Sequence, residues 1–258
     1  MDLQLSGKRA IVTGASRGIG LAVARALHAE GARVAMVARS AEDLRAAAEG
    51  IGTPFVADTS DDASVRAVVA AVVDAFGGVD ILVNAAARPS GGPAPALADT
   101  TDDALRAEVE TKVLGYLRTA RAVAPHLVAG GWGRIVNISG LNARQAGSLV
   151  GSIRNVAVSA MTKNLADELG PAGVNVTVVH PGTTVTERTP GMLADRAAAD
   201  GTTPDAVAAQ LASPVSIGRL VTAAEVADVV VFLCSPRSVA VNGDAVAVGG
   251  GTRGAIHY

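Results

Sequence analysis

Short apolar runs alternate along most of this chain with longer segments in which apolar residues recur at helical spacing. Seven runs are typical of β-strands: Ala10–Thr13, Val34–Ala38, Phe55–Ala57, Ile81–Asn84, Arg134–Ile138, Val174–Val179 and Ala245–Val248. The clearest helical segments are Ile19–Glu30, Asp61–Phe76, Asp102–Ala129, Leu149–Leu169 and Ala223–Cys234. Since the runs are too apolar for a sheet with one solvated face, we expect strands buried on both faces in a parallel sheet.

This alternation predicts one α/β domain with a doubly wound sheet over residues 1–258, because successive parallel strands need right-handed crossovers through helices. No linker or internal repeat interrupts the pattern. Two stretches lack it: about 88–98, which is rich in Gly and Pro, and about 183–219. Loops after the carboxyl ends of parallel strands line the ligand crevice, so we expect these two stretches to form the substrate walls.

The composition argues against several classes of partner and binding site. Aromatic residues make up only 2% of the chain, so the core has to be built from Ala, Val, Leu and Ile. A formal charge of -2 gives no electrostatic reason to expect a nucleic-acid or membrane partner. A single cysteine, Cys234, and four scattered histidines argue against a disulfide or a metal site. With no signal peptide or membrane-span pattern, we expect a cytoplasmic protein that acts on a small molecule.

A glycine-rich turn follows the first predicted strand, in the pattern Thr13-Gly14-x-x-x-Gly18-x-Gly20. A strand that turns sharply into a helix points the helix's unpaired N–H groups and its positive dipole end at the turn, which suits a diphosphate. Gly14 permits the tight turn, Gly18 a close approach of backbone to phosphate, and Gly20 close packing of helix on strand. The alternative, a glycine turn without a ligand, is disfavoured by the αβ repeat that follows.

The end of the second predicted strand favours NADP(H) over NAD(H). Ala38 stands where an NAD-binding domain places an acidic residue for the ribose hydroxyls, and Arg39 follows it. Arg17, in the glycine turn, lies on the same side. Two guanidinium groups near the ribose favour a 2′-phosphate, although each arginine alone could be a solvated surface residue. Asp58, after the third strand, could bind the adenine amino group or cap a helix.

Together these motifs resemble the short-chain dehydrogenase/reductase superfamily. The matching segments are the glycine turn, Asp58, Asp80 to Ala86, His180-Pro181-Gly182-x-x-x-Thr186, and Asn242-Gly243 with Gly249-Gly250. They match in order and spacing from about residue 5 to 252. The resemblance implies a Rossmann-type domain with a seven-stranded parallel sheet, a nicotinamide dinucleotide cofactor, and a homotetramer or homodimer built on the long fourth and fifth helices.

The resemblance also implies roles for individual residues. The backbone of Ile19 would contact the diphosphate, Asn84 would brace the crevice, the backbone of Thr184 would hold the carboxamide, and Thr186 would contact the diphosphate. The full expected cofactor-binding set is Thr13, Gly14, Ser16, Arg17, Gly18, Ile19, Gly20, Arg39, Asp58, Thr59, Asn84, Ala85, Pro181, Gly182, Thr184 and Thr186.

The catalytic half departs from the family pattern. Members that reduce carbonyls use a Ser, a Tyr four residues before a Lys, and an Asn; the Tyr is the acid, and the Lys lowers its pKa. Matching the flanking segments places Gly140 at the Ser position and Gly151 at the Tyr position. Asn155 falls at the Lys position and Lys112 at the Asn position.

The chain's only tyrosines, Tyr116 and Tyr258, do not repair this departure, because neither has a lysine four residues later. The sequence therefore indicates an atypical member in which none of the four expected catalytic side chains is in place.

Four residues are the catalytic candidates that remain. Lys112 could supply positive charge or a proton near the nicotinamide, or it could extend to solvent. Tyr116 lies one helical turn further on a similar face, where packing is the alternative role. Ser139, at a strand end, could hydrogen-bond a substrate oxygen, and Asn155 is expected to face the crevice.

Our hypothesis is an oxidoreductase that transfers a hydride from NADPH to a small organic substrate without the Tyr–Lys pair. Suitable acceptors are an iminium or imine, a quinone-like ring, or a ketone whose neighbouring hydroxyl delivers the proton. General acid catalysis is worth about 10²–10⁴-fold, so an enzyme without it can still be effective. The alternative is a non-redox lyase or isomerase, or a non-catalytic nucleotide-binding protein on the same fold.

Overall fold

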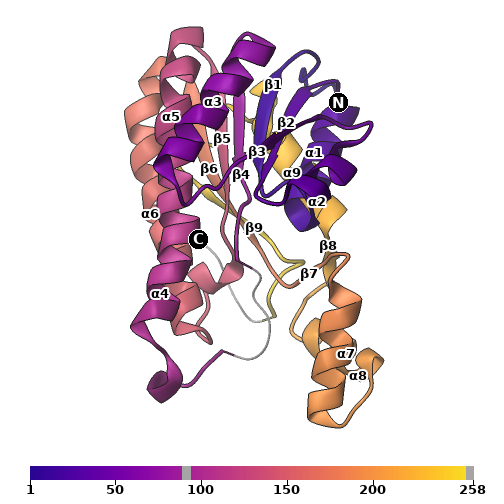
Figure 1. Cartoon of the computed structure of the whole chain (residues 1–258). Helices are drawn as coiled ribbons and strands as arrows, with labels where there is room; N and C mark the ends of the chain where they lie inside the picture. The colour runs from indigo at the N-terminus through magenta and orange to yellow at the C-terminus, as the bar shows by residue number, and fades with distance from the viewer. Residues whose placement is uncertain (89–93, 254–258) are drawn as a thin grey trace.

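The chain forms a seven-stranded sheet with the strand order β3-β2-β1-β4-β5-β6-β9 in a computed structural model that describes residues 1–88 and 94–253 (Figure 1). The strands are β1 (Arg9–Thr13), β2 (Arg33–Ala38), β3 (Thr53–Val56), β4 (Ile81–Asn84), β5 (Gly133–Ile138), β6 (Val174–Pro181) and β9 (Ala245–Val248). Every neighbouring pair in it is parallel. The prediction of a parallel, doubly wound sheet is confirmed.

The central strands are buried on both faces, as their unbroken apolar runs predict. All six residues of β5 and all eight of β6 are buried. Residues of β1 pair with β2 on one side and with β4 on the other, so Thr13 stands opposite both Val37 and Asn84. The order of the strands reverses here, and ligands of open α/β sheets bind outside the carboxyl ends at such a point.

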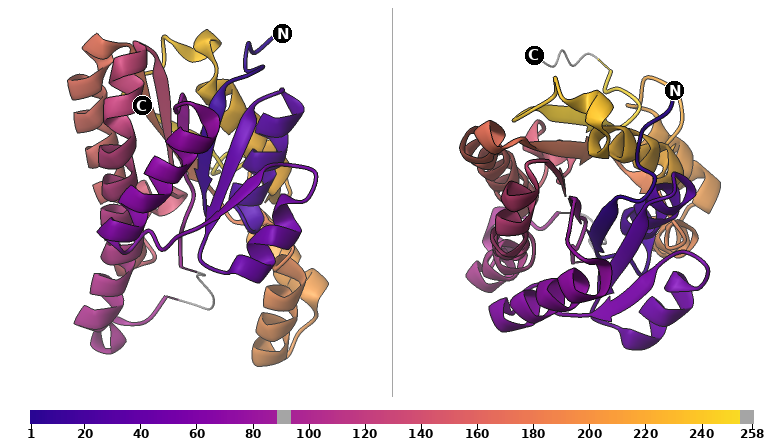
Figure 2. Two further views of the ribbon diagram at one scale, coloured as in Figure 1. Left: turned by 45° about the horizontal axis from the view of Figure 1, so that its top comes forward. Right: turned by 90° about the horizontal axis from the view of Figure 1, so that it is seen from above.

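Helices cover both faces of the sheet (Figures 1 and 2). One apolar core joins the sheet to α1 (Gly18–Ala29), α2 (Ala41–Ala48) and α9 (Ala223–Cys234). A second core joins it to α3 (Asp62–Phe76), α5 (Gly115–Gly130) and α6 (Leu149–Leu169). The short helical turns are Leu97–Asp99, Leu141–Ala143, Gly170–Ala172 and Pro236–Ser238. No helix in the described part of the chain is both long enough and apolar enough to cross a membrane.

Local sequence signals set where several helices begin. The side chain of Asp61 accepts a hydrogen bond from Ala63 N at the start of α3, and Ser148 does the same for Gly151 N at the start of α6. Thr222 and Glu225 form a reciprocal capping box at the start of α9. These contacts fix the ends of helices that the hydrophobic pattern alone leaves imprecise.

The segment predicted as one helix over Asp102–Ala129 is interrupted. It consists of α4 (Asp102–Glu108), a π-helical turn (Val109–Leu114) and α5. A π-turn inserts an extra residue into the helical ladder and is frequent at functional sites. The only buried residue of this turn is Lys112.

The prediction of an irregular stretch over about 183–219 is wrong in part. This stretch contains α7 (Thr189–Asp200) and α8 (Pro204–Ala212), and β7 (Thr184–Val185) pairs with β8 (Val221–Thr222). The two helices project from the end of the sheet beside β7 (Figure 1). The sequence does contain a helix-start signal here, Thr203 followed by Pro204. In the structure Thr203 accepts a hydrogen bond from Ala206 N, and Pro204 is the first residue of α8. Part of the other irregular stretch, residues 89–93, lies outside the described residues.

Candidate active site

The glycine turn has the conformation that its sequence predicts. Gly14 and Gly18 have φ angles of +66° and +59°, which favour glycine. A Cβ on Gly14 would lie 2.8 Å from Ala86 Cα, so the backbone after β4 packs directly on the turn. Helix α1 begins at Gly18, immediately after Arg17 in extended conformation. The turn therefore presents the amino end of α1 at the carboxyl edge of the sheet.

Thr13, at the end of β1, is hydrogen-bonded to the loop that follows β4. Its Oγ1 accepts hydrogen bonds from Ala85 N at 3.1 Å and Ala86 N at 3.2 Å, and the side chain is buried. The loop after β4 is thus held against the glycine turn. This contact gives Thr13 and Ala85 a structural role at the carboxyl edge of the sheet.

Asn84 is buried within a polar network that joins both central strands to helices. Thr119 Oγ1 donates to Asn84 Oδ1 at 2.7 Å, and Asn84 Nδ2 donates to Asn137 Oδ1 at 3.0 Å. Asn137 Nδ2 in turn donates to Thr162 Oγ1 at 2.9 Å. The network crosses β4 and β5 from α5 to α6, so Asn84 holds the carboxyl ends of these two strands to the helices.

Arg17, just before α1, and Arg39, just after β2, are both exposed. With Asp58 and the glycine turn they make up what we call the nucleotide half of the carboxyl edge of the sheet. Asp58 Oδ1 accepts hydrogen bonds from Ser60 Oγ and Ser60 N, which lower the pKa of this carboxyl group, and Arg39 contributes electrostatically. Asp58 stays an accessible carboxylate near Arg39. The suggestion that it caps a helix is wrong, since Asp61 caps α3. Thr59 lies beside the start of α5, close to Gly115.

The loop after β6 returns to the glycine turn. Pro181 ends β6, and the backbone at Gly182 packs closely on Gly249. In the following β7–α7 segment, the Cγ2 atom of Thr186 would lie 3.8 Å from a Cβ on Gly18. Thr186 is therefore placed next to the amino end of α1, and Thr184 lies two residues before it in β7.

Sequence reasoning missed Glu187 at this point. Its carboxylate accepts hydrogen bonds from Gly18 N, at 2.9 Å to Oε1 and 3.2 Å to Oε2. No signal in the local sequence pairs two residues 169 positions apart.

The four catalytic candidates converge on the carboxyl end of β5. Lys112 Nζ donates to Ser139 O at 2.8 Å, and Tyr116 OH donates to Ile138 O at 3.0 Å. Ser139 Oγ donates to Asn155 O at 3.1 Å. Ser139 therefore connects the π-turn that carries Lys112 to helix α6. All four side chains are buried.

Lys112 is a buried amine with a perturbed acidity. Its exposed fraction is 4%, and burial lowers its pKa to about 7. Burial is the largest cause of this net value; the Arg154 guanidinium also lowers the pKa, and the Glu108 carboxylate raises it. Arg154 and Glu108 form an ion pair between α6 and α4. This pair is a second feature that sequence reasoning missed.

Tyr116 is fully enclosed, and burial raises the pKa of its phenol. Its hydroxyl is already committed to the Ile138 carbonyl. This geometry fits a residue that positions the end of β5. Tyr258 lies outside the described residues.

Amide groups occupy the space beside Gly140 and Gly151. A Cβ on Gly140 would lie 2.9 Å from Asn155 Nδ2, and a Cβ on Gly151 would lie 2.9 Å from Asn142 Nδ2. Ser148 Oγ would be 2.7 Å from the same Cβ of Gly151. Asn155 Oδ1 is buried without a hydrogen-bond partner. A larger residue at either glycine would therefore displace an asparagine side chain.

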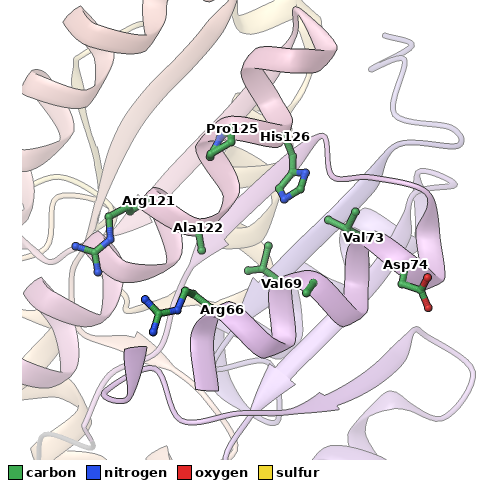
Figure 3. A pocket seen from close by; sticks show the side chains of 9 residues that line it. Arg66, Val69, Val73, Asp74, Arg121, Ala122, Pro125 and His126 are labelled. Carbon is green, nitrogen blue, oxygen red and sulfur yellow. The ribbon is translucent and has the colours of Figure 1, made fainter. Parts of the chain in front are cut away.

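One groove among the described residues lies away from the carboxyl edge of the sheet. A groove of about 470 Å³ between α3 and α5 is lined by Val69, Val73 and Pro125, with Arg66 and Arg121 on its walls (Figure 3). It lies between helices on one face of the sheet rather than at the strand ends. No group of His, Cys, Asp or Glu residues within 1–88 and 94–253 is arranged to hold a metal ion.

Comparisons with known proteins show which chains this one resembles. A family model described as enoyl-(acyl carrier protein) reductase matches residues 14–253. The short-chain reductase protein NovJ of Streptomyces niveus is 36% identical, with 94% of this chain and 92% of the relative covered.

Two solved structures are also similar. L-sorbose reductase from Gluconobacter frateurii, complexed with NADPH and L-sorbose, has a TM-score of 0.91 and 29% identity, covering 99% of this chain and 100% of the other. An actinorhodin polyketide ketoreductase with NADPH has a TM-score of 0.87 and 34% identity, covering 95% and 96%. By sequence and by fold, this chain belongs to the short-chain dehydrogenase/reductase superfamily.

Proposed function

We propose that this protein is an atypical NADPH-dependent reductase, which transfers a hydride to a small organic substrate without the usual Tyr–Lys pair. The observation that carries the proposal is the contrast between the cofactor side and the catalytic side of the carboxyl edge of the sheet. The nucleotide half keeps the positive-φ glycine turn, Arg17, Arg39 and Asp58. The catalytic half has glycine at two of the expected positions.

The residues at the nucleotide half fit the cofactor. The amino end of α1 suits a diphosphate, because its N–H groups and dipole favour negative charge. Arg17 and Arg39 would hold a 2′-phosphate, and Asp58 would accept from the adenine amino group. Relatives whose structures contain NADPH support this assignment. The bound cofactor supplies the hydride.

On the catalytic side, we propose that Lys112 places positive charge near the oxygen that becomes negative as the hydride arrives. Ser139 Oγ would donate to that oxygen after leaving the Asn155 carbonyl. Asn155 Oδ1, which lacks a donor, would accept a hydrogen bond from the ligand. Tyr116 positions the end of β5. Two acceptors with such an oxygen need no protein proton: a quinone-like ring, and a ketone whose neighbouring hydroxyl delivers the proton. An iminium, the protonated form of an imine, needs none either, because the hydride converts it into a neutral amine.

Two measurements test this proposal in sequence. A titration that follows NADPH fluorescence should detect binding, and R17A and R39A should weaken NADPH more than NADH. Deuteride transfer from labelled NADPH to candidate ketones, imines and quinones should then identify the acceptor. No binding at millimolar NADPH would refute the reductase, whereas tighter NADH than NADPH would refute only the roles of Arg17 and Arg39.

A second candidate is a non-redox enzyme, such as a lyase or isomerase, or a non-catalytic nucleotide-binding protein. The enclosure of Lys112 and Tyr116 favours it, since both side chains already bond to backbone carbonyls. It predicts NADPH binding with no deuteride transfer to any acceptor class.

We also propose a cytoplasmic homo-oligomer, a homotetramer or a homodimer, built on α5 and α6. Leu149, Ile153 and Val156 expose apolar side chains at helical spacing along α6, and Leu117 does so on α5. An apolar helix face of this kind is commonly buried by a partner. A second copy of this chain is the partner that the family resemblance implies.

A further inference from the structure

Glu187 places a carboxylate on the first N–H of helix α1. Both of its oxygens lie within hydrogen-bond distance of Gly18 N, at 2.9 Å and 3.2 Å. Gly18 opens a helix of 12 residues, so its N–H carries part of the positive helix dipole. The side chain of Glu187 is exposed and belongs to the segment between β7 and α7. An internal anion therefore occupies the position that suits a diphosphate.

We infer that Glu187 competes with the cofactor diphosphate for Gly18 N–H, and so weakens cofactor binding until its side chain moves away. This inference rests on the proposed function, because it requires the diphosphate to bind at the glycine turn. The N–H of Gly18 donates a single hydrogen, so it cannot serve both acceptors fully. Two anions at that distance would also repel each other.

The structure provides room for the displaced carboxylate. A cavity of about 500 Å³ lies beside the turn, and its walls include Glu187 itself together with Arg17 and Arg188. A carboxylate that leaves Gly18 thus remains near Arg188, while Arg17 is left for the 2′-phosphate.

The backbone around Glu187 is closed by local hydrogen bonds. Thr186 N donates to Thr189 Oγ1 at 2.8 Å, and Thr189 N donates to Thr186 O at 3.0 Å. Rotation of the Glu187 side chain is therefore sufficient, and the turn that positions Thr186 need not open. Thr186 stays next to Gly18 while the carboxylate is exchanged for the cofactor.

The test compares E187Q and E187A with the wild type in NADPH titrations at low ionic strength. We expect both variants to bind NADPH about two- to fivefold more tightly, the range that one charge at an exposed helix terminus typically contributes. D195N is the matched control, because Asp195 is an exposed carboxylate on α7, the helix that follows Glu187, and its replacement changes the net charge equally. D195N should leave the affinity unchanged.

Two further readouts separate this competition from a general charge effect. Adenosine 2′-monophosphate, which lacks the diphosphate bridge, should bind E187Q and wild type equally. Thermal unfolding should show E187Q less stable than wild type without NADPH and equally stable when saturated with it. The apo difference reflects the lost contact at Gly18, which the cofactor replaces in the complex.

The outcomes are distinct. If neither wild type nor E187Q binds NADPH, the proposed function fails. If wild type binds but E187Q binds no more tightly than D195N, the competition is refuted and the cofactor site stands. Tighter binding of adenosine 2′-monophosphate by E187Q would also overturn it, because the effect would then not act through the diphosphate.

Discussion

Replacing Lys112 by methionine tests whether the Lys112 amine is desolvated in the folded protein. Methionine keeps an unbranched apolar stem that ends at Cε and lacks the titrating amine. In the unfolded chain the amine has its ordinary pKa of 10.5, whereas burial lowers the pKa to about 7 in the folded protein. Because the unfolded state holds the proton more strongly, unfolding takes up a proton between these two values, and wild-type stability should rise with pH across that window.

The magnitude follows from the same two values. Below pH 7 both states are protonated, and the burial of charge costs roughly 5 kcal/mol relative to the neutral amine. Between pH 6 and pH 9 roughly 2.5 kcal/mol of this cost is relieved. K112M has no such cost, but it leaves the Ser139 carbonyl without its donor, which costs about 1–3 kcal/mol at every pH. The variant should therefore gain most over wild type in acid.

Urea unfolding of both proteins at pH 6, 7.5 and 9 measures this difference. The stability of K112M minus that of wild type should fall by roughly 2.5 kcal/mol from pH 6 to pH 9. K163M is the control, because Lys163 is a largely exposed lysine on α6, paired with Asp167. A pH-independent difference between K112M and wild type would refute the view of Lys112 as a desolvated amine with a lowered pKa.

Three further predictions concern packing and assembly. G140S should lower the free energy of unfolding by about 1–3 kcal/mol in chemical denaturation, because its Cβ meets Asn155 Nδ2. In an N155A background the same substitution should cost much less, and an equal cost in the wild-type and N155A backgrounds would contradict this packing. N84A should cost about 1–3 kcal/mol by breaking the Thr119–Asn84–Asn137 network, whereas exposed N164A should stay within about 0.5 kcal/mol. I153D should lower the mass in light scattering, while V239D, at another exposed apolar position, should not; an unchanged mass for I153D would remove α6 from the interface.

Much of the fold was accessible from the chain itself, because strand burial and glycine geometry leave local marks. The runs at Ile81–Asn84 and Ala245–Val248 coincide with β4 and β9, and the helical pattern over Leu149–Leu169 coincides with α6. These runs are apolar because parallel strands are buried on both faces. The π-turn around Lys112 could not be predicted in this way, because its one buried residue is a lysine and not an apolar residue.

The sequence by itself determined the glycine turn and the two arginines near it. Gly14 and Gly18 adopt positive φ angles that the turn requires, and Arg17 and Arg39 are placed by their distance from strand ends. Only the tertiary structure decided what surrounds Lys112 and Gly18. The Ser139 carbonyl reaches Lys112 and the Glu187 carboxylate reaches Gly18 across separations of 27 and 169 residues. Contacts of that kind depend on how distant elements pack, and no local pattern of residue types encodes them.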